Sequence, residues 1–280
     1  EQEPLPEGGV YVLELSSYQI DLTHSLACDV AVLLNITPDH LDRYDGDFAK
    51  YAASKSRLLA MQTRGQNAIA RFTDARVLGQ FAEGSIASIL EDVLQNRGIA
   101  PGEQAEWPSL QGPHNRENAA AAIEACDILG IPTAQIRAAL KSYPGLPHRQ
   151  QLAAVIDGVQ YVNDSKATNV ESASGSLLFY KNIRWIAGGQ LKDGGLDKLK
   201  ENLKNVKSAY LIGSSIQDFI AVIDPNLYKV CESLDKAVRE AAKDAEPGDT
   251  VLLSPACASY DQFKNFEDRG DKFNDLVSKL

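Results

Sequence analysis

No apolar run in this sequence approaches the roughly 18 residues that a membrane-spanning helix needs. Basic charge is also scarce: 28 lysines and arginines stand against 38 acidic residues, and the net charge of −10 argues against general nucleic-acid binding. The four cysteines are scattered and form no CxxC pair. Zinc and thioredoxin-like sites are therefore disfavoured, and a reducing, cytoplasmic compartment is expected.

The sequence lacks an initiator methionine and the basic and apolar parts of a signal peptide. It begins with EQEPLPEGG, a polar, Pro/Gly-rich connector, so we expect a fragment of a longer protein. A composition of 44% hydrophobic and 24% charged residues is ordinary for a globular protein. A length of 280 residues is sufficient for two domains.

Short apolar runs alternate with helical patterns, which predicts an α/β fold with largely parallel sheets covered by helices. The Pro/Gly-rich stretch YPGLPHRQ separates two patterned regions, and we predict domains at 1–145 and 146–280. In the first we expect strands at 10–15, 30–36 and 68–71 and helices at 48–61, 115–129 and 133–140; residues 73–110 show no clear pattern. In the second we expect strands at 152–156, 159–163, 183–187, 208–212, 228–231 and 250–254, with helices at 169–180, 195–203, 215–222, 234–244 and the C-terminus.

Three polar loops directly follow strands of the second region. NDSKATN follows VQYV, GGQLKDGG follows IRWIA, and SPACAS follows TVLL. Ligands of parallel sheets bind beyond the carboxyl ends of the strands. One such loop could simply start a helix, but three together favour a binding site.

The helix expected at 48–61 carries a lysine on its apolar face. Tyr51, Ala52 and Leu59 share that face by helical spacing, and Lys55 falls near its middle. One interpretation places Lys55 at the edge of the face, with its ammonium extended to water. The other places it partly buried, where the neutral amine is favoured and could take up CO₂ to become a carbamate.

Several other side chains suit ligand binding. Glu14 ends an expected strand and His40 follows another, so together with a carbamate they could serve Mg²⁺; a solvent-facing carboxylate and a capping or core histidine are the alternatives. Asn118 could present its amide to a purine, whereas Asn115 could be only a helix cap. Arg149 follows the domain boundary, where it could reach a nucleotide or be a surface charge.

Lys192 and Cys257 are two further candidates for a functional role. Lys192 follows Gly188 and Gly189, which allow close backbone approach, and a lysine there could meet a carboxylate. Cys257 has no adjacent histidine or basic partner, so a structural thiol is favoured over a nucleophile.

In this order the motifs resemble the Mur ligases of peptidoglycan synthesis, most closely the members that add D-glutamate. NDSKATN and SPACASYDQFKNFEDRG are the most specific, because sister ligases and folylpolyglutamate synthase carry other residues there. The matching segments span nearly the whole chain: ELSSYQID, LNITPDHLDRY, YAASKSRL, GPHNRENAAAA, GLPHR, NDSKATN and SPACASYDQFKNFEDRG.

The resemblance implies part of a central P-loop-type ATPase domain followed by a C-terminal, amino-acid-binding Rossmann-like domain. It implies ATP-dependent ligation of D-glutamate to UDP-N-acetylmuramoyl-L-alanine through an acyl phosphate, with Mg²⁺, by a cytoplasmic monomer. The implied catalytic residues are Lys55, His40 and Lys166, and the implied metal ligands are Glu14, His40 and carbamylated Lys55. The implied ATP-binding residues are Asn115, Asn118, Arg149 and Asp164. The implied D-glutamate-binding residues are Thr168, Lys192, Ser259, Tyr260 and Phe266.

Two departures from the family pattern qualify these expectations. The phosphate-binding loop with Gly-Lys-Ser/Thr and the domain that holds the UDP group are missing from the sequence, so the chain alone is expected not to complete the reaction. Gln190 stands where many relatives are expected to carry an acid or another polar residue. A sister ligase that adds another amino acid, and a non-catalytic nucleotide- or amino-acid-binding module, remain the alternatives.

Overall fold

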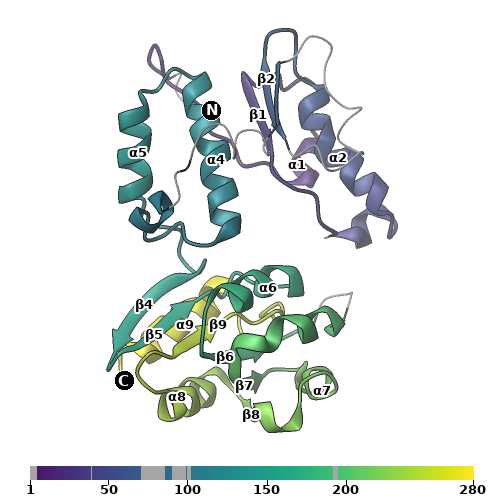
Figure 1. Ribbon diagram of the computed structural model, residues 1–280. Helices are drawn as coiled ribbons and strands as arrows, with labels where there is room; N and C mark the ends of the chain where they lie inside the picture. The colour runs from purple at the N-terminus through teal and green to yellow at the C-terminus, as the bar shows by residue number, and fades with distance from the viewer. Residues whose placement is uncertain (1–4, 39, 71–85, 90–98, 100–101, 192–194) are drawn as a thin grey trace. The chain divides into compact units, whose positions relative to one another are not determined.

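The structure, a computed structural model, describes residues 5–38, 40–70, 86–89, 99, 102–191 and 195–280. The chain divides into a first unit, Glu1–Tyr143, and a second unit, Pro144–Leu280 (Figure 1). The predicted division between residues 145 and 146 lies two residues further along the chain. Among the described residues, no helix has both the length and the apolar character that crossing a membrane requires.

A small parallel sheet forms the centre of the first unit. Its strands, in the order β1-β2-β3, are β1 (Val30–Leu33), β2 (Asn67–Ala70) and β3 (Ile86–Ile89). Ala31 and Ala68 pack with Leu59 in one apolar cluster, while Ile69 packs with Ala120 in another on the opposite face. Apolar side chains on both faces are typical of parallel strands covered by helices.

The helices expected in the first unit are confirmed. Residues 48–60 of the expected 48–61 form α2, residues 115–129 lie in or next to α4, and residues 133–140 lie in α5. The helical elements are α1 (Ser17–Asp21), η1 (Leu41–Tyr44), α2 (Phe48–Ala60), η2 (Glu103–Glu106), α4 (Pro113–Ile128) and α5 (Thr133–Ser142). The strands expected at 30–36 and 68–71 correspond to the shorter β1 and to β2.

The strand expected at 10–15 is wrong. Residues 9–16 have no regular secondary structure, and the apolar side chains of residues 10–13 are between 50% and 91% exposed. A β-rich run needs a neighbouring strand for its backbone hydrogen bonds, and none of the strands in the described residues pairs with it. Glu14 therefore lies exposed in an irregular segment, just before the Ser16–Gln19 capping box that starts α1.

The second unit is built on one six-stranded sheet with the order β4-β5-β9-β6-β7-β8. The edge strand β4 is antiparallel to β5, and all other neighbours are parallel. The strands are β4 (Gln151–Ile156), β5 (Val159–Asn163), β6 (Ile183–Gly188), β7 (Val206–Ile212), β8 (Tyr228–Glu232) and β9 (Thr250–Leu253). All six strands expected in this region are confirmed.

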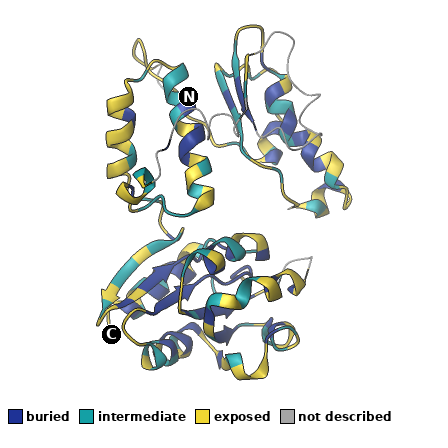
Figure 2. Ribbon diagram, in the orientation of Figure 1, coloured by how far each residue is buried: buried dark blue, intermediate teal, exposed yellow. Residues whose placement is uncertain are grey.

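Helices cover both faces of this sheet, as expected. Leu177 of α6 and Phe219 of α7 pack with Trp185 on one face, whereas Val238 of α8 and Phe273 of α9 pack on the other. Figure 2 shows the central strands of this sheet as largely buried ribbons between more exposed helices, whereas the edge strand β4 is partly exposed. The helical elements are α6 (Val170–Phe179), η3 (Asp197–Asn205), α7 (Ile216–Ile220), η4 (Pro225–Leu227), α8 (Leu234–Asp244) and α9 (Phe266–Val277). The helix expected at 195–203 is the 3₁₀ element η3.

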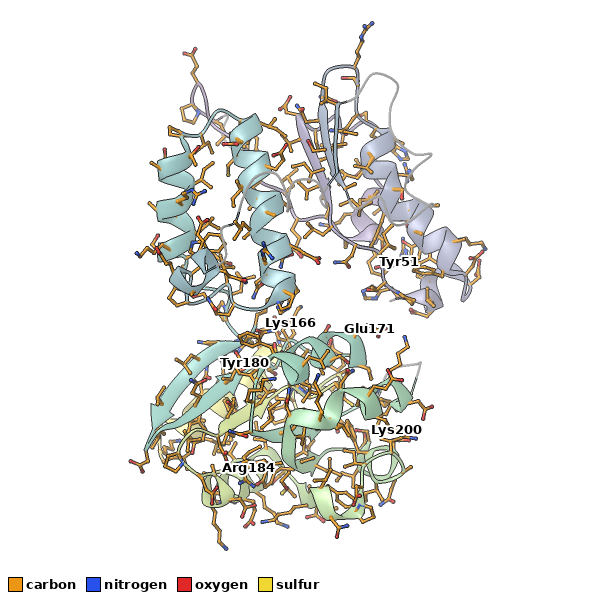
Figure 3. The ribbon with its side chains drawn as sticks, in the orientation of Figure 1. Tyr51, Lys166, Glu171, Tyr180, Arg184 and Lys200 are labelled. Carbon is orange, nitrogen blue, oxygen red and sulfur yellow. The ribbon has the colours of Figure 1, made fainter. Side chains whose placement is uncertain are left out.

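A charged network lies at the amino ends of the central strands. Asp249 is 1% exposed and accepts hydrogen bonds from Arg184 Nε at 2.8 Å and Lys207 Nζ at 2.6 Å. Burial opposes ionisation of Asp249, yet these hydrogen bonds hold its pKa below its usual value. Figure 3 shows Arg184 at this end of the second unit and Lys166 at the other, where the candidate site lies.

Candidate active site

The three polar loops of the second unit converge, as the sequence predicts. They follow β5, β9 and β6, which are adjacent and parallel, so their carboxyl ends share one edge of the sheet. Backbone N–H groups link them: Ala256 donates to the carbonyl of Ala167 at 3.0 Å, and Gln190 and Ala258 donate to each other's carbonyls at 2.9 Å. These bonds make the three loops one continuous polar edge.

Lys166 and Phe266 are brought together at this edge. The Nζ atom of Lys166 lies 3.9 Å from the centroid of the Phe266 ring, within cation–π range. The buried His148 ring meets the same phenyl ring edge-on, with centroids 6.2 Å apart. A Cβ atom at Gly270 would lie 2.2 Å from His148 Nδ1, so the close approach of His148 to α9 depends on that glycine.

Asp164 lies deep in the loop that follows β5 and is 6% exposed. Its carboxylate accepts hydrogen bonds from Ser176 Oγ at 2.7 Å, Ser254 Oγ at 2.8 Å and the backbone N–H of Gln150 at 3.2 Å. Burial raises the pKa of Asp164 to about 6, although these bonds and the charge of Arg149 act in the opposite direction. In the structure the positive charge of Arg149 therefore acts on the carboxylate of Asp164.

The raised pKa predicts a pH-dependent stability that the variant Asp164→Asn should lack. The folded protein binds this proton more tightly than the unfolded chain does, so stability falls as pH rises from about 4 through about 6. Relative to Asp164→Asn, the unmodified protein should lose up to about 3 kcal/mol of unfolding free energy between pH 4 and pH 7. Urea unfolding of both proteins across this range measures the difference, and parallel pH profiles would contradict it.

The predicted D-glutamate-binding residues differ in their access to solvent. Ser259 is 2% exposed, whereas the neighbouring Tyr260 is 71% exposed. Thr168 and Phe266 are half-buried. Lys192 lies outside the described residues, although Gln190, two residues before it, joins the polar edge.

One residue that contacts two of these loops was not predicted from the sequence. Arg269 on α9 is 1% exposed and hydrogen-bonds Ser165 in the loop after β5 and the carbonyls of Cys257 and Ala258 in the loop after β9. A signal was present, because Arg269 shares the buried face of its helix with Gly270 and Phe273. Cys257 itself is fully buried and burial raises its pKa to about 11, which fits the structural thiol expected.

In the first unit, Lys55 lies on the buried face of α2. Tyr51, Ala52 and Leu59 are buried, and at 100° per residue Lys55 falls between them. Its side chain is half-buried, with Nζ 5.3 Å from the centroid of the Tyr51 ring. The interpretation with the ammonium extended to water and the conversion to a carbamate both stay predictions.

His40 and Glu14 are both exposed. His40 occupies the N-cap position of η1 without a side-chain cap bond, and its ring meets Tyr18 of α1 with centroids 5.3 Å apart. The core-histidine alternative is therefore wrong. Within the described residues, no three His, Cys, Asp or Glu side chains are grouped as a metal site. The metal-ligand roles of Glu14, His40 and Lys55 stay predictions; Mg²⁺ usually takes one or two protein groups beside waters and substrate phosphates.

Asn115 and Asn118 lie in the first turns of α4. The N-cap of this helix is Gly112, and Asn115 Nδ2 donates to the carbonyl of Gln111 at 2.9 Å, so the alternative in which Asn115 only caps the helix is wrong. Asn118 donates to Asn115 Oδ1 at 3.4 Å and is exposed. It also borders a cavity of about 410 Å³ between α4 and α5, lined mainly by apolar side chains such as Ala122 and Ile136.

The fold is that of an α/β protein with a polar edge at the carboxyl ends of parallel strands, which is where such sheets bind their ligands. Solved structures share this fold. A MurF ligase from Thermotoga maritima in complex with ADP aligns with a TM-score of 0.64 and 18% identity over 90% of this chain and 63% of its own. A bifunctional folylpolyglutamate synthase/dihydrofolate synthase from Yersinia pestis, complexed with AMPPNP and Mn ion, aligns with a TM-score of 0.62 and 20% identity over 89% of this chain and 62% of its own.

Sequence similarity identifies the family of this chain more specifically than the shared fold does. The Mur ligase middle domain matches residues 5–91, and the Mur ligase, glutamate ligase domain matches residues 148–257. The chain belongs to the Mur ligase family. It is 52% identical over 280 residues to a UDP-N-acetylmuramoylalanine--D-glutamate ligase of Novosphingobium aromaticivorans, and it spans 63% of the length of that relative.

Proposed function

We propose that this chain is part of an ATP-dependent ligase that joins D-glutamate to UDP-N-acetylmuramoyl-L-alanine in peptidoglycan synthesis. The observation that carries the proposal is the polar edge of the second unit, where Lys166, Thr168 and Ser259 come from two loops that are bonded to each other. Phe266, the first residue of α9, lies against Lys166 at this edge. The identity of 52% to a D-glutamate ligase over the whole chain supports the same substrate.

The carboxylate substrate must be activated before an amine can convert it into an amide. A carboxylate is a poor electrophile, so its oxygen first attacks the γ-phosphorus of ATP, releasing ADP and giving an acyl phosphate. The amine of D-glutamate then attacks the acyl carbon, and inorganic phosphate leaves from the tetrahedral intermediate as the amide forms. Positive groups that face the developing negative charge lower both barriers.

The second unit supplies the amino-acid site in this proposal. Lys166 places its ammonium beside the transferred phosphate or the amino-acid carboxylate. Thr168, Ser259, Tyr260 and Phe266 shape the D-glutamate site, and Lys192 meets its side-chain carboxylate. The half-buried and buried positions of Thr168 and Ser259 support a site that excludes water.

ATP and Mg²⁺ are assigned to the remaining predicted residues. Asn118, with Asn115 beside it, faces adenine, and Arg149 and Asp164 hold the nucleotide. The internal hydrogen bonds of Asp164 leave little free acceptor capacity, so its contact with the ribose requires rearrangement of those bonds. When bound, Mg²⁺ neutralises charge on the phosphates.

Glu14, His40 and carbamylated Lys55 are assigned to the metal. In this reading the first unit, within residues 1–145, is the central ATP-binding domain, and the second, within 146–280, is the amino-acid-binding domain. We further propose a cytoplasmic monomer, supported by the nucleotide-linked substrate and by the four cysteines, which are free thiols.

Phosphate release with each amino acid in turn tests the function. The assay requires a full-length ligase that carries this chain, supplied with ATP, Mg²⁺ and UDP-N-acetylmuramoyl-L-alanine. We expect phosphate release with D-glutamate and at most background with L-glutamate or the amino acids used by sister ligases. Turnover with another amino acid would indicate a sister ligase, and no turnover with any amino acid would indicate a non-catalytic binding module.

A further inference from the structure

Two loops that carry the proposed amino-acid site depend on a single buried cation. The loop after β5 contains Lys166 and Thr168, and the loop after β9 contains Ser259. Between them, Arg269 enters from the first turns of α9 and is 1% exposed. Long charged side chains are rarely buried to this degree without a carboxylate partner.

The guanidinium of Arg269 bonds both loops at once. Its Nε donates to Ser165 Oγ at 3.0 Å, and one Nη donates to the carbonyl of Ser165 at 2.9 Å. The two Nη atoms donate to the carbonyl of Cys257 at 3.2 and 3.1 Å, and one reaches that of Ala258 at 3.4 Å. Ser165 immediately precedes Lys166, and Ala258 immediately precedes Ser259, so the bonds fix the backbone directly beside both site residues.

The third loop is tied to the same group through Ala258. The carbonyl of Ala258 accepts both from Arg269 and from the backbone N–H of Gln190. Gly189 has a φ of +138°, and a Cβ atom there would lie 2.3 Å from that carbonyl and 3.2 Å from Arg269 Nη1. Glycine is therefore required for the loop after β6 to reach the guanidinium and its acceptors.

All acceptors of Arg269 in the described part of the chain are neutral oxygens. Burial lowers the pKa of Arg269 to about 10, which still leaves it positively charged near neutral pH. Among the described residues the guanidinium hydrogen-bonds no carboxylate, although the charge of Asp261 acts on it, so Arg269 contributes positive potential at the polar edge. The substrate proposed for that edge carries two carboxylates, so the field favours its binding.

We propose that Arg269 is a positioning residue that holds the loops after β5 and β9 in the arrangement that D-glutamate requires. This inference rests on the proposed function. Five donors in a planar fork allow Arg269 to bond several carbonyls simultaneously, which the compact ammonium of lysine cannot reproduce. The variant Arg269→Lys therefore keeps the positive charge but loses the set of hydrogen bonds that holds the two loops together.

Steady-state kinetics of Arg269→Lys and Arg269→Met in a full-length ligase that carries this chain test the proposal. We expect Arg269→Lys to raise the KM for D-glutamate by about tenfold or more, and Arg269→Met by about 100-fold, because small misplacements of binding groups have effects of this size. The KM for ATP should change by less than about twofold. Arg184→Met is the matched control, because Arg184 is a mostly buried arginine of the same unit at the opposite end of the strands; it should lower the Tm and leave the KM for D-glutamate unchanged.

The outcomes separate a positioning role from a structural one. An unchanged KM for D-glutamate in folded Arg269→Lys would overturn the proposal, as would equal rises in the KM for D-glutamate and ATP. If Arg269→Met does not fold, Arg269→Lys decides; if neither folds while Arg184→Met does, the role is structural and the proposal is wrong. If the unmodified ligase does not use D-glutamate, the proposed function fails independently of Arg269.

Discussion

Replacing Lys55 by alanine is expected to lower ligation by about 10³-fold or more in a full-length ligase that carries this chain. The side chain lies mid-way across the buried face of α2 and is half-buried, where a neutral amine can attack CO₂ and become an anionic carbamate. Alanine removes that anion and leaves a space beside Tyr51. Formate or acetate should therefore restore part of the activity by supplying a carboxylate in that space, and phosphate release measures both effects.

Lys50 provides the matched control on the same helix. It is exposed and pairs with Asp45 at 2.6 Å, so Lys50→Ala should leave ligation within about twofold of the unmodified enzyme. Full activity of Lys55→Ala would exclude the proposed role. Loss of activity that no short carboxylic acid restores would mean that Lys55 acts as an ammonium and not as a carbamate.

The strongest sequence signal for function was a charged residue on an apolar helical face. Lys55 carries this signal, because Tyr51 and Leu59 lie on either side of it on the helix surface. Arg269 is likewise a charged residue on the buried face of α9, which it shares with Gly270 and Phe273, although the motif that contains it predicts no role for it. Helical periodicity therefore places both charged residues on the buried faces of their helices, although Lys55 itself is only half-buried.

The fold of the second unit could be predicted because its strands are short apolar runs separated by turn residues and helical patterns. Each such run there has a neighbour with which it pairs. The run at 10–15 has the same composition, but a strand forms only where another strand satisfies its backbone groups, and no local pattern reports that partner. The expectation that Glu14 ends a strand is wrong for the same reason.

Side-chain contacts between distant segments could not be predicted from local patterns. Asp164 bonds Ser254, 90 positions away, and His148 meets Phe266 at the edge where Lys166 also lies. Such contacts depend on strand order, which places β5 beside β9. Family motifs indicated that Asp164 is important, while the raised pKa and its internal hydrogen bonds follow only from the three-dimensional arrangement.

Lys166→Met is expected to lower kcat by about 10²–10³-fold with a much smaller change in the KM for ATP, because it removes a positive group from the reacting phosphate. Lys166 Nζ lies 3.9 Å from the Phe266 ring centroid, and the ring is itself packed against His148. Phe266→Leu keeps an apolar side chain but removes the aromatic face, so it should give a smaller, about tenfold, fall in the same parameter.

The pair of variants distinguishes two positions for the ammonium. If Lys166 serves the transferred phosphate, both variants lower kcat; if it serves the D-glutamate carboxylate, both raise the KM for D-glutamate and leave kcat nearly unchanged. Lys198→Met is the control, since Lys198 is an exposed lysine of the same unit that pairs with Glu171 at 2.9 Å and should have no effect on either parameter. Unaltered kinetics in both Lys166→Met and Phe266→Leu would remove Lys166 from the catalytic site, because an ammonium next to either reacting group cannot be deleted without a measurable loss of binding or rate.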